Sequence, residues 1–411
     1  MLGCVLLVTS GCRRLQASYH NREGLELYRA GDAHGAAICF QRALELDGDL
    51  AEALNNLGLS YQSLGLRTEA TDAYRSALRI DPELSVAHYN LALLYDEISM
   101  RPQALKSYRN AVETDPTDVD AAVRLVALLI EENRATEAVP HARMSVAAAP
   151  GRVDVWKGLG SALAATGRVE ESVDAFVEAS AIAPDDPEVL MDLGTAYLAS
   201  GDTKSAELQL RAVVKRWPEL AQAHNNLGVA LLRNGRHAAA ISALQQAIAL
   251  KGEFVAAVAN LGDVYREMGL WGFACLSYEQ ALDLRENVAP VHRGIAACRA
   301  QQGKPGEAET HLQRALELEP EDAQALAGLA WLYTSGPGER PREAVTYARM
   351  AVELAPADRR VDYLTVLAEA QVNEGDAAGA VSTLKRALAE DPAAAHIQRR
   401  ISQLEGTKSS K

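Results

Sequence analysis

The chain has 411 residues, a formal net charge of −14 and only 5% aromatic residues, and alanine is abundant throughout. The acidic balance argues against a nucleic-acid binder, because neutralising phosphates requires a surplus of Lys and Arg. Few aromatic residues and many alanines favour closely packed helices over a β-sheet.

Residues 1–12 read MLGCVLLVTSGC, carry no charge and precede Arg13 and Arg14. The ending Thr-Ser-Gly-Cys resembles the lipobox of bacterial lipoproteins. This resemblance implies a signal peptide over 1–12, lipidation of Cys12 by several acyl chains and a linker over 13–16. The segment lacks a positive n-region and is too short to cross a bilayer. An uncleaved anchor, or an apolar N-terminus packed on the first repeat, are the alternatives.

The lipobox resemblance also implies a location. It predicts an outer-membrane lipoprotein of the bacterial cell envelope, facing the periplasm, with Arg13 after the cysteine as the sorting signal. The alternative is a cytoplasmic protein whose true start lies elsewhere.

A 34-residue period begins at Ala17. Nine units follow without an insertion, starting near 17, 51, 85, 119, 153, 187, 221, 255 and 289, and two further units start near 323 and 361. In the first nine units the eighth place is Gly in six and the twentieth is Ala in eight. Most units close with a proline.

Each unit is predicted to be a pair of helices. Leu54, Leu57 and Tyr61 share one helical face with Gly58. A glycine near the middle of most units, such as Gly65, indicates the C-terminus of a first helix. The closing proline ends the second helix. Small residues at the eighth and twentieth places allow the two backbones to approach, and neighbouring pairs must stack because one pair cannot bury its apolar face.

These columns resemble the tetratricopeptide repeat (TPR) family. The family pattern is matched in the fifth unit by Trp156, Leu159, Gly160, Phe176 and Pro184. The resemblance implies an all-α fold, a right-handed α-solenoid of about eleven units over residues 17–394. Residues 395–411 are predicted to form a capping helix and tail, with Ile397, Ile401 and Leu404 at helical spacing.

The sequence offers no catalytic motif. Nucleotide-binding loops, nucleophile elbows and metal-binding motifs are absent from it, so we expect no enzyme activity, cofactor, metal or small-molecule substrate. His88 and His224 share one repeat place, and we expect them on a polar helix face. The five cysteines are an odd, scattered set and not a disulfide framework. Three of them are expected to be small core residues: Cys39, Cys275 and Cys298.

The sixth place of the repeat is predicted to point away from the partner helix. Asparagine occupies it at Asn56, Asn90, Asn226 and Asn260. This column resembles the asparagine ladder of the O-linked N-acetylglucosamine transferase superhelix, whose amides hold a peptide backbone, since an amide both donates and accepts. The resemblance implies a peptide-binding groove at these four residues. The alternative is solvated helix residues, and we expect the preceding Asn55 and Asn225 to lie on the surface.

The sequence therefore predicts a non-catalytic scaffold that binds other proteins or peptides, contacts no nucleic acid and meets a membrane only through its lipid anchor. Lipoproteins that it resembles assist secretion, pilus or envelope assembly. The alternative is a cytosolic adaptor, or a regulatory array acting on a separately encoded enzyme.

Overall fold

The computed structural model describes residues 2–335, 340–356 and 359–406, with side chains from Arg13 onward. Within these ranges the chain is helical and contains no strand. The helices are α1 (Leu2–Arg29), α2 (Ala33–Leu46), α3 (Ala51–Ser63), α4 (Arg67–Ile80), α5 (Ser85–Glu97), α6 (Arg101–Thr114), α7 (Val119–Glu131), α8 (Ala135–Ala148), α9 (Val153–Ala165), α10 (Val169–Ile182), α11 (Pro187–Ala199), α12 (Thr203–Arg216), α13 (Ala221–Arg233), α14 (His237–Leu250), α15 (Val255–Glu267), α16 (Trp271–Leu284), α17 (Ala289–Gln301), α18 (Pro305–Leu318), α19 (Ala323–Ser335), α20 (Pro341–Glu353), α21 (Arg360–Glu374), α22 (Ala377–Glu390) and α23 (Ala395–Gly406).

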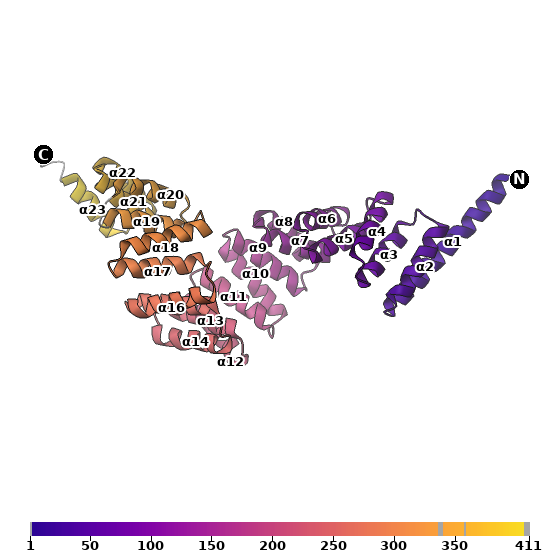
Figure 1. The fold of residues 1–411 in the computed structure, drawn as a ribbon, viewed down its shortest axis with the longest axis horizontal. Helices are drawn as coiled ribbons and strands as arrows, with labels where there is room; N and C mark the ends of the chain where they lie inside the picture. Colours follow the sequence, from indigo (N-terminus) through magenta and orange to yellow (C-terminus); the bar gives the residue numbers. More distant parts are fainter. Residues whose placement is uncertain (1, 336–339, 357–358, 407–411) are drawn as a thin grey trace. The chain divides into compact units, whose positions relative to one another are not determined.

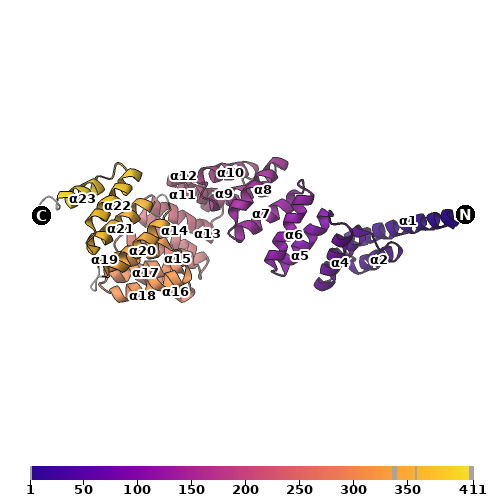
Figure 2. The same ribbon diagram turned by 90° about the horizontal axis from the view of Figure 1, so that it is seen from above.

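The helices form two compact halves, residues 1–202 and 203–411. Within each half every helix packs against the one before it and the one after it (Figures 1 and 2). Odd-numbered helices up to α21 are the first helices of the repeats, and even-numbered helices are the second helices. The all-α solenoid predicted from the period is confirmed.

The turn between the two helices of a repeat has a fixed backbone conformation. Gly65 has a φ of 75°, and the N–H of Leu66 donates to the carbonyl of Tyr61 at 2.9 Å, which ends the first helix. The same place carries positive φ in each of the first nine repeats, at Gly31, Gly65, Ser99, Asn133, Gly167, Gly201, Gly235, Gly269 and Gly303. The predicted helix end at this glycine is confirmed, and Ser99 and Asn133 adopt the same conformation without glycine.

A small residue at the eighth place makes room for a large one sixteen residues later. A Cβ atom on Gly58 would lie 2.6 Å from the ring of Tyr74, closer than any two such atoms can approach. A Cβ atom on Gly160 would lie 2.8 Å from the ring of Phe176. The fourth repeat reverses the sizes, since Val126 at the eighth place is followed sixteen residues later by Ala142. The volumes on the two helices are thus matched.

The residue at the twentieth place of a repeat lies directly against the residue at the eighth place. In the first nine repeats the twentieth place is a buried alanine, except in the fifth repeat, where it is the buried Ser172. The hydroxyl of Ser172 donates to the carbonyl of Gly160 at 2.8 Å. This bond confirms that the two helix backbones approach closely at these two columns.

Helix α23 packs against α22 in the C-terminal half. Ile397, Ile401 and Leu404 of α23 are buried in the core cluster that also contains Leu384 of α22. The remaining face of α23 is largely exposed.

The contact between Gly58 and Tyr74 predicts that adding one methyl group at residue 58 destabilises the fold. We expect Gly58→Ala to lower the free energy of unfolding by about 1–2 kcal/mol, because the overpacking exceeds the gain in helix propensity. Gly272→Ala is the control, since nothing lies within 4 Å of a Cβ there. Urea unfolding followed by circular dichroism measures both. Equal losses in the two variants would contradict the packing account.

Candidate interaction groove

The first helices form the inner face of each half. Consecutive first helices contact one another, as α3 contacts α5 and α17 contacts α19. Contacts between consecutive second helices are sparse by comparison within the described residues. A stack whose first helices approach more closely curves toward them, and arrays of this kind bind partners on such a concave face.

In the N-terminal half the predicted ladder residues are linked to the neighbouring repeat. Asn56 donates from Nδ2 to Oδ1 of Asn21 at 3.0 Å, and Asn90 donates in the same way to Asn55 at 2.9 Å. Asn55 donates in turn to Asn56 at 3.4 Å. A chain of amides therefore joins α1, α3 and α5.

The C-terminal half repeats this arrangement. Asn260 donates to Oδ1 of Asn225 at 2.8 Å, and Asn225 donates to Oδ1 of Asn226 at 3.1 Å. Gln222 also donates to Asn226. The spacing of 35 residues between Asn225 and Asn260 equals that between Asn55 and Asn90. The structure thus links Asn56 to Asn90 through Asn55, and Asn226 to Asn260 through Asn225.

The expectation that Asn55 and Asn225 lie on the surface was wrong. Their exposed fractions are 3% and 5%, because each amide bridges two first helices. Buried amides need such partners. The signal in the sequence was the 35-residue spacing from a fifth-place Asn to the sixth-place Asn of the next repeat. Asn56, Asn226 and Asn260 are half-buried and Asn90 is buried. Peptide binding by these four residues stays a prediction.

The expectation that His88 and His224 occupy a polar helix face was also wrong. Both are buried, and their Nε2 atoms lie 3.0 Å and 2.9 Å from the carbonyls of Pro82 and Pro218, the closing residues of the preceding repeats. Trp156 at the same repeat place donates to the carbonyl of Pro150 at 2.8 Å. The fourth place of the repeat thus supplies a hydrogen-bond donor to the carbonyl of the proline that follows the second helix of the preceding repeat.

Where the ladder ends in the C-terminal half, the inner face opens into a cavity of about 730 Å³. Four consecutive first helices line it, α15, α17, α19 and α21. Its wall includes Asp263, Arg266, Arg293, Gly294, Ala297, Gly328, Trp331, Arg359, Asp362 and Tyr363. The side chain of Trp331 is 47% exposed, and it offers a large apolar surface to a ligand.

Two glycines explain why the cavity lies here. Gly294 and Gly328 occupy the repeat place that Asn260 fills one and two repeats earlier. A Cβ on Gly294 would lie 2.6 Å from the ring of Tyr278, and one on Gly328 would lie 2.9 Å from Leu312. In this packing a Cβ would clash at both places, and because glycine occupies them the inner face carries no sixth-place side chain here.

The three arginines of the cavity wall have aspartate partners. Arg293 pairs with Asp322, Arg359 with Asp362 at 3.0 Å, and Arg266 with Asp263 at 3.1 Å. The Asp263 carboxylate also accepts the hydroxyl of Tyr278 at 2.8 Å. Burial and this carboxylate both raise the pKa of Tyr278, so it stays neutral. The wall is polar but locally neutralised, and it favours a neutral, apolar group over a small ion.

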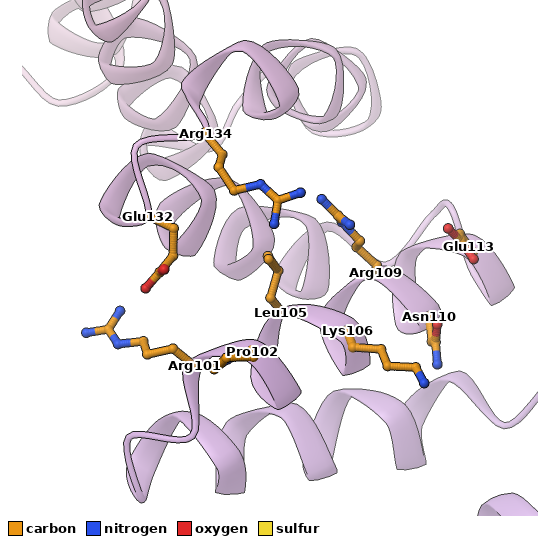
Figure 3. A pocket seen from close by; sticks show the side chains of 9 residues that line it. All are labelled: Arg101, Pro102, Leu105, Lys106, Arg109, Asn110, Glu113, Glu132 and Arg134. Atoms are coloured by element: carbon orange, nitrogen blue, oxygen red, sulfur yellow. The ribbon is translucent and has the colours of Figure 1, made fainter.

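A second pocket lies on α6 and the turn between α7 and α8, with a volume of about 310 Å³ (Figure 3). Figure 3 shows Arg109 and Arg134 approaching each other above Leu105. Arg109 and Arg134 share the single carboxylate of Glu137, and Arg101 pairs with Glu131. Because Glu113 and Glu132 also line the pocket, it offers an anion little net attraction.

Asp192 takes the sixth place in the sixth repeat. It is half-buried, and burial raises the pKa of its carboxyl group to about 6, although Lys157 opposes the shift. Lys157 stands 35 residues earlier, at the spacing of the asparagine pairs, but its ammonium group bonds Glu188 at 2.9 Å. The ladder is interrupted here by a carboxylate that is desolvated.

Cys12 falls within α1, but its side chain lies outside the described side chains, so lipidation stays a prediction. Over the described ranges, no group of three or more His, Cys, Asp and Glu residues is arranged to hold a metal ion. None of the helices in those ranges combines the length and apolar character needed to cross a bilayer.

Stacked helical hairpins with a groove along their first helices define the class of α-solenoid repeat proteins. Models of the tetratricopeptide repeat match residues 21–85, 191–254 and 299–359, a second such model matches 85–216, and a third matches 257–290. The chain belongs to the tetratricopeptide repeat family.

Solved structures share this fold at low sequence identity. A chain in the crystal structure of the APC/C hetero-tetramer Cut9–Hcn1 is 15% identical with a TM-score of 0.53, and the match covers 98% of this chain and 93% of that one. Yeast Tom70 is 14% identical with a TM-score of 0.53, with 96% of each chain covered. No curated protein matches the chain.

The raised pKa of Asp192 predicts a pH-dependent effect of Asp192→Asn. The carboxyl contributes stability below its unfolded pKa of about 4, and this contribution is lost as the pH rises through about 6. We therefore expect Asp192→Asn to stabilise the protein at pH 7 by about 1 kcal/mol, allowing for partial solvation, and to have little effect at pH 4.

Asp154→Asn is the matched control, because a hydrogen bond from Arg152 lowers the pKa of Asp154. This variant should lose stability at pH 7. Urea unfolding at pH 4 and pH 7 measures both. A destabilised Asp192→Asn protein at pH 7 would refute the assignment of a desolvated carboxylate.

Proposed function

We propose that this chain is a non-catalytic scaffold that binds an extended segment of a partner protein along the first helices of its C-terminal half. The observation that carries the proposal is the exposed Trp331 within a cavity that spans four consecutive first helices. Membership in the tetratricopeptide repeat family supports an interaction scaffold.

The dimensions of the groove suit a peptide. Adjacent packed helices lie about 9 Å apart, so four first helices span roughly 27 Å. An extended chain of roughly eight residues covers that length. A small molecule would contact only part of this wall.

The composition of the groove indicates how the peptide is held. Trp331 and the bare backbone at Gly294 and Gly328 receive an apolar or aromatic side chain. Asn226 and Asn260 lie on α13 and α15, toward one end of the same inner face, and their half-buried amides contact the peptide backbone. Asn56 serves the same purpose in the N-terminal half, and the buried Asn90 contributes least.

A second part of the proposal concerns location. We propose that the chain is anchored through lipid at Cys12 in the bacterial cell envelope and assists secretion, pilus or envelope assembly. The uncharged stretch ending in Thr-Ser-Gly-Cys supports this part. The competing proposal is a cytosolic adaptor or a regulatory array for a separately encoded enzyme.

Trp331→Ala tests the groove. Peptides selected from a random display library on the full chain should carry an apolar or aromatic side chain. Removing the indole should weaken their binding roughly 30-fold, since a buried tryptophan anchor contributes about 2 kcal/mol or more. Fluorescence anisotropy of a labelled peptide measures the affinity.

Phe273→Ala is the matched control, because Phe273 is 58% exposed but lies on α16, a second helix. It should leave the affinity unchanged. Equal binding by wild type and Trp331→Ala, with unchanged circular dichroism, would remove the groove from the proposal.

Metabolic labelling with palmitate tests the anchor. The wild-type protein expressed in a bacterium should incorporate label and sediment with membranes, whereas Cys12→Ala should do neither. Cys4→Ala is the control and should still be labelled. An unlabelled wild-type protein would favour the cytosolic alternative.

A further inference from the structure

Two buried cysteines meet where the eighth repeat packs against the ninth. Cys275 lies on α16, the second helix of the eighth repeat, and Cys298 lies on α17, the first helix of the ninth. Their exposed fractions are 4% and 0%, and both belong to one hydrophobic cluster. The sequence alone predicts each of them to be a small core residue and does not indicate that they meet.

Contacts from each helix reach the cysteine of the other. The thiol of Cys298 donates to the carbonyl of Trp271 at 3.8 Å, and Trp271 lies one turn before Cys275. Gln302, one turn after Cys298, donates from Nε2 to Sγ of Cys275 at 3.3 Å. The two thiols therefore lie close together at the joint between α16 and α17.

We propose that Cys275 and Cys298 form a reversible intramolecular disulfide bond that links α16 to α17. This modification site goes beyond the proposed function and does not depend on it. The oxidant is a small-molecule disulfide such as oxidised glutathione.

The chemistry proceeds by two exchanges. One cysteine thiolate attacks the oxidant disulfide, forms a mixed disulfide and releases one glutathione thiol. The second cysteine thiolate attacks the protein sulfur of that mixed disulfide and releases the second glutathione. The protein loses two thiol hydrogens, and the oxidant is reduced to two thiols.

The environment determines how fast the bond forms. Burial and the neighbouring Cys275 thiol raise the pKa of Cys298, so little thiolate exists in the closed structure. Attack therefore requires a transient local separation of α16 and α17. Once formed, the bond constrains the unfolded chain and fixes a joint that carries part of the groove wall, including Trp271 and Arg293.

The test uses the full chain, incubated with oxidised glutathione. A parallel sample of the native protein is treated with N-ethylmaleimide, and the time that this reagent needs to label both thiols is measured. The incubation with oxidised glutathione lasts for that time, so that both thiols have become accessible. The protein is then denatured, alkylated and digested. We expect a cross-linked peptide pair containing Cys275 and Cys298, lighter by two hydrogens and cleaved by dithiothreitol. The thermal midpoint should rise by roughly 5 °C and return on reduction.

Three variants make the result specific. Cys275→Ala and Cys298→Ala should form no cross-link and show no shift of the midpoint, whereas Cys39→Ala should behave as the wild type. Free or glutathione-bearing Cys275 and Cys298 at the end of the incubation would overturn the proposal. A midpoint shift that persists in Cys275→Ala would also overturn it.

Discussion

The contact between a glycine at the eighth place of a repeat and the large side chain sixteen residues later is the constraint on which the rest of the structure depends. It allows two short helices to touch along their length, as the hydrogen bond from Ser172 to the Gly160 carbonyl shows. The same rings reach the next repeat. Tyr278 packs against Gly262 of its own repeat and against Gly294 of the following one. One side chain thus sets the geometry within a repeat and between repeats.

This packing also shapes the inner face. Where the next repeat can carry an asparagine at the sixth place, amides join consecutive first helices, as in the pairs Asn55–Asn90 and Asn225–Asn260. Where glycine takes the sixth place, at Gly294 and Gly328, the large side chain of the preceding repeat packs directly on its backbone, and these glycines line the cavity beside Trp331. The polar network and the groove therefore depend on which residue occupies the same repeat place, asparagine or glycine.

The sequence predicts most of this fold because its constraints are local and repeated. Positive φ at Gly65 and its equivalents, the alanine column and the helix pairs all follow from a 34-residue period. The burial of Asn55 and His88 was missed because it depends on contacts with an adjacent repeat, and for Asn55 only the 35-residue spacing to Asn90 indicated such a contact. The meeting of Cys275 with Cys298 likewise depends on how α16 packs on α17, which no spacing rule encodes.

The proposed binding surface is formed by the first helices of the C-terminal half. Hydrogen–deuterium exchange of the full chain, with and without a selected peptide, tests it most directly. Peptide binding at this surface should add protection in α15, α17, α19 and α21 and leave exchange in α6 and α8 unchanged. Protection confined to the second helices, for example around Phe273 and Leu276 on α16, would contradict it.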